Sequence, residues 1–119
     1  MGYVRVKGKV SSITDKSRCV EIEFITDTGA MLTVVPAPVL KKLAIEPRSK
    51  ERFKLATGEM RELPLGNAQI EIEGRERFID VVFGSEEAPA LLGVTTLETL
   101  GFELDPTTGK LKPIEFMLL

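Results

Sequence analysis

Residues 24–36 read FITDTGAMLTVVP, and this stretch decides the fold. An apolar run that ends at Thr26 leads directly into Asp27, Thr28 and Gly29. A carboxylate at the end of a strand is carried by rigid backbone, and the glycine permits a tight turn in which backbone amides approach that carboxylate. The Thr28 hydroxyl can hydrogen-bond to a neighbouring backbone. These three residues alone also fit an ordinary Asp-Gly-type turn after a strand, so the interpretation depends on the surrounding sequence.

Alternating apolar and charged residues on both sides of this stretch predict half-buried strands. Residues 18–26 place their apolar side chains on one face and two glutamates on the other. Residues 69–73 repeat the pattern and put Gln69 on the solvent-exposed face. Both segments therefore have one face for a core and one for water.

Glycine-containing turns separate the remaining strands. Glu73-Gly74 and Thr57-Gly58 each lie between two strand-like runs, and residues 105–109 (DPTTG) form a third turn. Residues 36–45 have helical spacing with proline in the first turn. Residues 95–100 combine a threonine cap with Gly101 as a stop. The sequence predicts one all-β domain, residues 1–119, shaped as a closed barrel with one or two short helices.

Composition excludes several classes of chemistry. The chain has 16 basic and 18 acidic residues, so it is not expected to bind nucleic acid through phosphate contacts. It has no histidine, which removes Ser-His-Asp catalysis and histidine-based metal sites; no metal and no cofactor is expected. Cys19 is the single cysteine and is interpreted as a small strand residue. The absence of a signal-like or membrane-spanning apolar run favours a soluble, cytoplasmic protein with no membrane partner.

Two motifs and a hairpin resemble one known family. FITDTGAMLTVVP is similar to the active-site loop of the retroviral-type aspartic proteases (retropepsins), with Thr33 and Val34 at the family's offsets. Residues 90–97 (ALLGVTTL), about sixty residues downstream, resemble the family's segment before its short C-terminal helix. The hairpin around residues 56–59 falls where the family has its flap. The resemblance covers roughly residues 18–105.

The resemblance implies a retropepsin-like closed barrel and an endopeptidase that acts on peptides or proteins. Two carboxylates must share a proton in such a site, and only one of the four aspartates lies in an Asp-Thr-Gly motif. A symmetric homodimer is the simplest source of the second carboxylate. By the same resemblance, the catalytic residues are Asp27, Thr28 and Gly29. Residues expected to contact substrate are Ala30, Met31, Ala56, Thr57, Gly58 and Leu92.

Departures from the family pattern leave alternatives open. Retroviral enzymes have an acidic residue at the position of Met31 and an arginine at that of Val94, and their flaps have several glycines where this hairpin has Gly58 alone. A non-catalytic dimeric interaction module with the same fold is therefore the second hypothesis. A small-ligand barrel with an accidental motif is the third, and it leaves the downstream match unexplained. Residues 114–119 are either a last core strand or a strand of the dimer interface.

Overall fold

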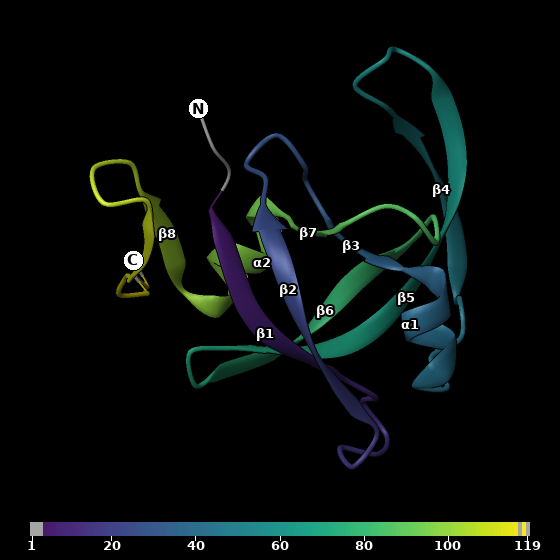
Figure 1. The fold of residues 1–119 in the computed structure, drawn as a ribbon, viewed down its shortest axis with the longest axis horizontal. Helices are drawn as coiled ribbons and strands as arrows, with labels where there is room; N and C mark the ends of the chain where they lie inside the picture. Colours follow the sequence, from purple (N-terminus) through teal and green to yellow (C-terminus); the bar gives the residue numbers. More distant parts are fainter. Residues whose placement is uncertain (1–3, 117, 119) are drawn as a thin grey trace.

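The computed structural model describes residues 4–116 and residue 118. About half of the chain is in strands, and there are two short helices in the part that the structure describes (Figure 1). In chain order the elements are β1 (Arg5–Ser11), β2 (Cys19–Thr26), β3 (Thr33–Pro36), α1 (Ala37–Lys42), β4 (Ser49–Lys54), β5 (Met60–Ile72), β6 (Arg75–Gly84), β7 (Ala90–Leu92), α2 (Val94–Leu100), β8 (Phe102–Asp105) and β9 (Lys110–Pro113).

Six strands of the described chain close into a barrel, which confirms the predicted fold class. Their order is β1-β2-β7-β3-β6-β5, and β5 pairs back with β1 to complete the circle. The closure brings β1 close to β5 at Gly8, where a Cβ atom would lie 2.9 Å from the carbonyl oxygen of Glu71. A side chain at Gly8 would therefore push the two strands apart.

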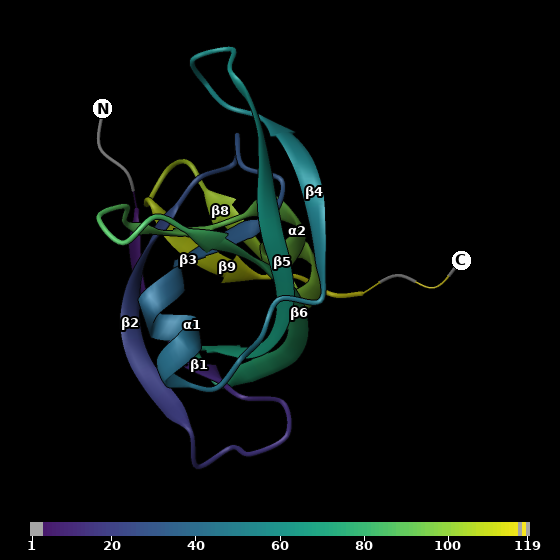
Figure 2. The same ribbon diagram turned by 90° about the vertical axis from the view of Figure 1, so that its right-hand side faces the viewer.

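Strand β5 belongs to the barrel and also to a projecting hairpin. Its last part pairs with β1 and β6, and its first part pairs with β4, with Lys54 opposite Met60. The β4–β5 hairpin rises from the barrel on the same side as the loop between β2 and β3 (Figures 1 and 2). The predicted hairpin at Thr57-Gly58 is present, and so is the turn at Glu73-Gly74, where both residues have positive φ.

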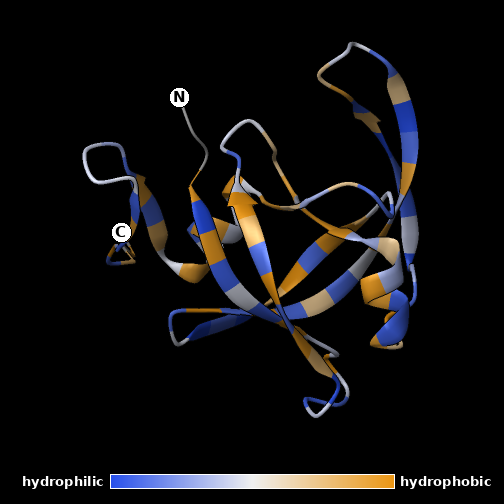
Figure 3. Ribbon diagram, viewed as in Figure 1, coloured by the Kyte–Doolittle hydropathy of each residue, from blue (hydrophilic) through white to orange (hydrophobic). Residues whose placement is uncertain are grey.

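The barrel interior is filled by the apolar face of its strands. Apolar and hydrophilic residues alternate along β1 and β2, as Figure 3 shows. The fully buried side chains include Val10, Phe24, Val35, Ile70 and Leu92. Gln69 departs from the predicted pattern, because it is only 7% exposed. It lies in the part of β5 that has a paired strand on each side, so its expected exposure was wrong.

Both helices are present, with different ends from those predicted. Helix α1 begins after Pro36 and stops at Lys42, because Ala44 has a positive φ of 59°. Helix α2 begins after Gly93, and no side chain caps its first turn. The predicted threonine cap is wrong, since the Thr95 hydroxyl donates instead to the Met31 carbonyl at 2.6 Å. Gly101 ends α2 in the left-handed conformation, as predicted.

After Pro113, the C-terminal residues that the structure describes form no core strand. Strands β8 and β9 make a separate two-stranded sheet that ends at Pro113. Phe116 and Leu118 are 56% and 91% exposed, so the core-strand alternative is wrong for the residues that the structure describes. Residues 117 and 119 lie outside the described residues, and the interface alternative stays a prediction. No helix of the described chain is long and apolar enough to span a membrane.

The junction between β7 and α2 packs directly behind the β2–β3 loop. The Gly93 amide donates to the Thr33 hydroxyl at 3.0 Å, and that hydroxyl lies 2.6 Å from the hydroxyl of Thr96. Both threonines are buried. A Cβ atom at Gly93 would overlap the Leu32 carbonyl carbon and lie 2.6 Å from the Leu32 carbonyl oxygen. The absence of a side chain at Gly93 therefore allows the two segments to meet.

We expect Gly93→Ala to lower the free energy of unfolding by about 1–3 kcal/mol, because the new methyl group overpacks backbone that cannot easily move. Gly29→Ala is the matched control, since a Cβ there meets only a carboxylate oxygen of Asp27, at 3.2 Å. Chemical denaturation of the two variants measures the difference. Equal destabilisation by both would show that the close approach at Gly93 is not a structural constraint.

Candidate active site

Backbone hydrogen bonds fix the position of Asp27. Strand β2 ends at Thr26, and the Asp27 amide donates to the Leu92 carbonyl at 3.1 Å, one residue beyond the parallel β2–β7 pairing. The Asp27 carbonyl accepts from the Ala30 amide at 3.0 Å. One carboxylate oxygen, Oδ1, accepts from the Gly29 amide at 2.9 Å. Asp27 is half-buried, so part of the residue is accessible to solvent.

Gly29 suits this position because it has no side chain, and not because of its backbone conformation. The expected tight turn is present, since the Ala30 amide bonds the Asp27 carbonyl, but Gly29 is not among the residues with positive φ, so its backbone conformation does not require glycine. Its amide does approach the carboxylate, as expected. Since Oδ1 of Asp27 lies 3.2 Å from where a Cβ would stand, a side chain at Gly29 would press on the carboxylate.

The first turn of α2 holds the residues that follow this loop. The Val94 amide donates to the Ala30 carbonyl at 2.9 Å. The amide and the hydroxyl of Thr95 both donate to the Met31 carbonyl, at 3.2 and 2.6 Å. These bonds join the Asp27 loop to the start of α2. They lie at residues 31 and 94, where the retroviral enzymes of the family pattern have an acidic residue and an arginine. Met31 itself is 62% exposed.

A cleft of about 380 Å³ runs between the Asp27 loop and the β4–β5 hairpin. Except for Asp27 and Lys54, its lining residues are apolar or glycine. They come from the loop, from β3, from the hairpin and from the neighbouring strands β6 and β7. The lining consists of Asp27, Gly29, Ala30, Met31, Leu32, Val34, Phe53, Lys54, Leu55, Ala56, Leu63, Val82 and Leu91.

Not every residue predicted for the site lines this cleft. Ala30, Met31 and Ala56 do, together with Asp27 and Gly29. Leu92 is completely buried on the core side of β7, and Leu91 takes the place expected for it. Thr28 is exposed and does not line the cleft. Thr57 and Gly58 form the exposed tip of the hairpin, where nothing lies within 4 Å of a Cβ built at Gly58.

Several lining residues were missed by sequence reasoning. Phe53, in β4, and Leu55, the first residue after β4 ends at Lys54, alternate with charged residues, a pattern that could have assigned them to one face of the hairpin. Leu63 lies opposite Glu51 on the paired strand. Val82 carried no such signal, because it is one of three consecutive buried residues in β6 and its face cannot be read from periodicity.

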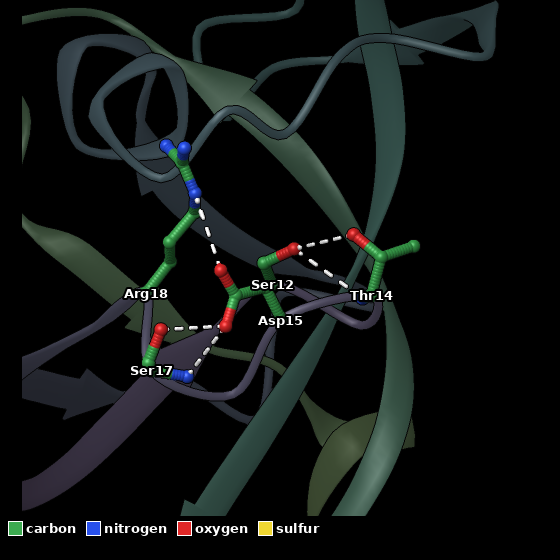
Figure 4. Close-up of polar contacts among 5 residues, drawn as sticks. All are labelled: Ser12, Thr14, Asp15, Ser17 and Arg18. Carbon is green, nitrogen blue, oxygen red and sulfur yellow. Dashed lines mark hydrogen bonds and ion pairs between the residues drawn. The ribbon is translucent and has the colours of Figure 1, made fainter.

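The other three aspartates have partners elsewhere in the described structure. Figure 4 shows the loop between β1 and β2, where Asp15 accepts from the hydroxyl and the amide of Ser17 at 2.6 and 3.0 Å. The hydrogen bond from the Ser17 hydroxyl is the main reason why the pKa of Asp15 is lowered. Asp80 accepts from the Asn67 amide group at 2.6 Å. The backbone amide of Thr107 similarly lowers the pKa of Asp105 in the β8–β9 turn.

Comparisons with known proteins agree with this geometry. Residues 4–107 match the family model described as aspartyl protease. The fold is similar to the solution structure of simian foamy virus (mac) protease, with a TM-score of 0.57 and 18% identity over 81% of this chain and 93% of that one. It is also similar to EIAV protease complexed with the inhibitor HBY-793, with a TM-score of 0.61 and 18% identity over 84% and 89% of the two chains. A comparison with curated proteins gave no match. Because the family model spans nearly all of the described barrel together with Asp27 and its cleft, the chain belongs to the aspartyl protease family.

Proposed function

We propose that the protein is a homodimeric aspartic endopeptidase in which two copies of Asp27, one from each chain, activate the attacking water. The observation that carries this proposal is the placement of Asp27. Its backbone is hydrogen-bonded within the barrel, and the half-buried residue lies at the edge of an apolar cleft beneath a projecting hairpin.

The chemistry follows from two carboxylates that share one proton. Like charges this close cannot both ionise readily, so one carboxyl stays protonated while the other is charged. The charged carboxylate takes a proton from water as the water oxygen bonds to the scissile carbonyl carbon. The protonated carboxyl donates to the carbonyl oxygen. Collapse of the tetrahedral intermediate then breaks the C–N bond: the carboxyl that took the proton from water gives it to the leaving nitrogen, and the other carboxylate takes a proton back from a hydroxyl of the intermediate.

A second copy supplies what a single chain lacks. The other three aspartates of the described structure have partners away from the cleft, so a second catalytic carboxylate within one chain has no source. The Thr28 side chain is exposed next to Asp27 and makes no hydrogen bond to the described part of its own chain, which suits a contact across a two-fold axis. Phe116 and Leu118 offer further apolar surface for such a contact.

The cleft suits an extended peptide with apolar side chains. Ala30, Met31 and Leu91 lie on its barrel side, and Phe53 and Leu55 face them from the hairpin. We propose that this hairpin acts as a flap, since its tip at Gly58 has few neighbours and can move without breaking core contacts. The proposal includes a cytoplasmic location, in keeping with the free and exposed thiol of Cys19.

Asp27→Asn should lower kcat/KM on a peptide library at least about a hundredfold, because it removes the group that takes the proton from water. The fold should survive, since asparagine can still accept the hydrogen bond from Gly29. Wild-type activity should follow a bell-shaped pH profile, which reports the two ionisations of the pair. Asp15→Asn is the control and should keep full activity. Cleavage by Asp27→Asn at the wild-type rate would refute the proposal, whereas an intact dimer with no wild-type activity would favour the non-catalytic interaction module.

Light scattering at micromolar concentration should give about twice the mass of one chain. Truncation after Pro113 removes the exposed Phe116 and Leu118 and should shift the equilibrium towards monomer, because less apolar surface is then available for burial. The shift is measured as the concentration at which half the protein is dimeric. If truncation leaves this concentration unchanged, the dimer contact lies elsewhere on the chain. If the full-length protein is strictly monomeric, no second copy of Asp27 is available and the proposed active site cannot form.

Amide hydrogen exchange should be faster in residues 54–60 than in β2, because the hairpin tip lies outside the barrel core. A peptide-like inhibitor with a hydroxyl in place of the scissile carbonyl should slow exchange in these residues by closing the hairpin over the cleft. The turn of residues 105–109 is an exposed internal control that lies outside the cleft lining. If the inhibitor binds and exchange in residues 54–60 stays the same, the hairpin is not a flap.

A further inference from the structure

A second hollow, of about 260 Å³, lies next to the proposed substrate cleft. Its wall consists of Leu32, three consecutive residues of β6 from Phe78 to Asp80, and the three threonines of α2. Apart from Leu32, none of these residues belongs to the cleft lining. The hollow is therefore separate from the catalytic carboxylate but shares one side chain with its cleft.

Phe78 is the most unusual residue of this wall. It is 66% exposed, although large aromatic side chains bury much apolar area when a partner is available. Directly beside it the wall offers hydroxyl groups of α2 and the carboxylate of Asp80, one oxygen of which already accepts from Asn67. An aromatic ring flanked by a few polar atoms is typical of a site that receives an apolar side chain together with its backbone.

The hollow adjoins the cleft at Leu32 and along β6. Side chains alternate along a strand, so Phe78, Asp80 and Val82 lie on the same face of β6. Val82 lines the cleft, and the other two line the hollow. On the opposite side, Leu32 borders both spaces. At about 3.3 Å per residue, Phe78 lies roughly 13 Å from Val82, which is the length of about four residues of an extended peptide.

Thr95 couples the wall of the hollow to the cleft. It lines the hollow, and its amide and hydroxyl both bind the carbonyl of Met31, which lines the cleft. Thr96, the next residue in the wall, is hydrogen-bonded to Thr33 in the core. The relative position of hollow and cleft is thus fixed by hydrogen bonds, so one extended ligand can contact both in a constant register.

We infer that this hollow is a distal subsite that binds a bulky apolar side chain of the substrate, about four residues from the residue that contacts Val82. The inference rests on the proposed endopeptidase function and adds a requirement for substrate length. The occupant is the same peptide that fills the cleft, because the shared Leu32 and the common face of β6 lead directly from one space to the other. Burial of the side chain against Phe78 supplies the affinity.

The test uses a short peptide that the wild type cleaves, selected from a randomised library. The peptide is extended at each end with glycine and serine, and a single leucine is scanned through the added positions. Because each chain of the proposed dimer carries one hollow, the leucine should raise kcat/KM about tenfold at one added position on each side of the scissile bond, as expected for burial of one apolar side chain. The measured quantity is the ratio of kcat/KM with leucine to kcat/KM without it. Phe78→Ser should bring this ratio close to one, and so should Thr99→Phe, which fills the hollow from the other wall. Ile13→Ser, which alters an exposed apolar residue outside both spaces, should keep the ratio.

Binding measured with Asp27→Asn separates the subsite from catalysis. Fluorescence anisotropy of the labelled peptides should show the same leucine preference and its loss in Asp27→Asn combined with Phe78→Ser. If the wild type cleaves the short peptide but shows no leucine preference in cleavage or binding, the subsite is refuted and the proposed function stands. If no library peptide is cleaved, the short peptide is selected by its binding instead; a leucine preference in binding, lost in the Phe78→Ser variant, would then support the subsite while the proposed function fails. Dissociation of the dimer by Phe78→Ser would assign the hollow to a contact between copies and overturn the inference.

Discussion

The close approach of Leu32 to Gly93 is the constraint on which the rest of the site depends. Two segments about sixty residues apart in sequence meet there without an intervening side chain, and a buried pair of threonines, Thr33 and Thr96, joins them beneath the surface. With this contact in place, the amides of Val94 and Thr95 reach the carbonyls of residues 30 and 31. The orientation of the Asp27 loop is therefore set by the backbone of the β7–α2 junction.

The barrel uses one long strand to place the β4–β5 hairpin over this loop. Strand β5 contributes buried residues such as Ala68 and Ile70 to the barrel and exposed ones such as Met60 to the hairpin. The hairpin is thus a continuation of the barrel wall rather than a separate insertion. Its base is anchored by pairing with β6 and β1, while at its tip no part of the described chain lies within 4 Å of a Cβ at Gly58. This division gives the cleft one side in the barrel and one side in the projecting hairpin.

Local signals in the sequence predicted much of the fold and part of the site. Glycine marked the hairpins because Gly58 and Gly74 both need positive φ, and alternation marked β2 because one of its faces is solvated. The same reasoning failed for Gln69, since its burial depends on pairing with both β1 and β6, which no local pattern encodes. It also misjudged which of Leu91 and Leu92 faces the cleft. That choice depends on the register of a three-residue strand, and a run of apolar residues leaves it undetermined.

The departure from the family pattern at residues 31 and 94 has a structural consequence. If the side chains of residues 31 and 94 formed an ion pair, both would be needed to hold the Asp27 loop in place. Here the amides of α2 and the Thr95 hydroxyl hold the loop through its carbonyls, so the side chain of Met31 has no bracing role. It is 62% exposed and lines the cleft instead. A flexible thioether adapts to apolar partners of different shape. Because these hydrogen bonds use the backbone carbonyl of residue 31, its side chain can face the cleft without any part in holding the Asp27 loop.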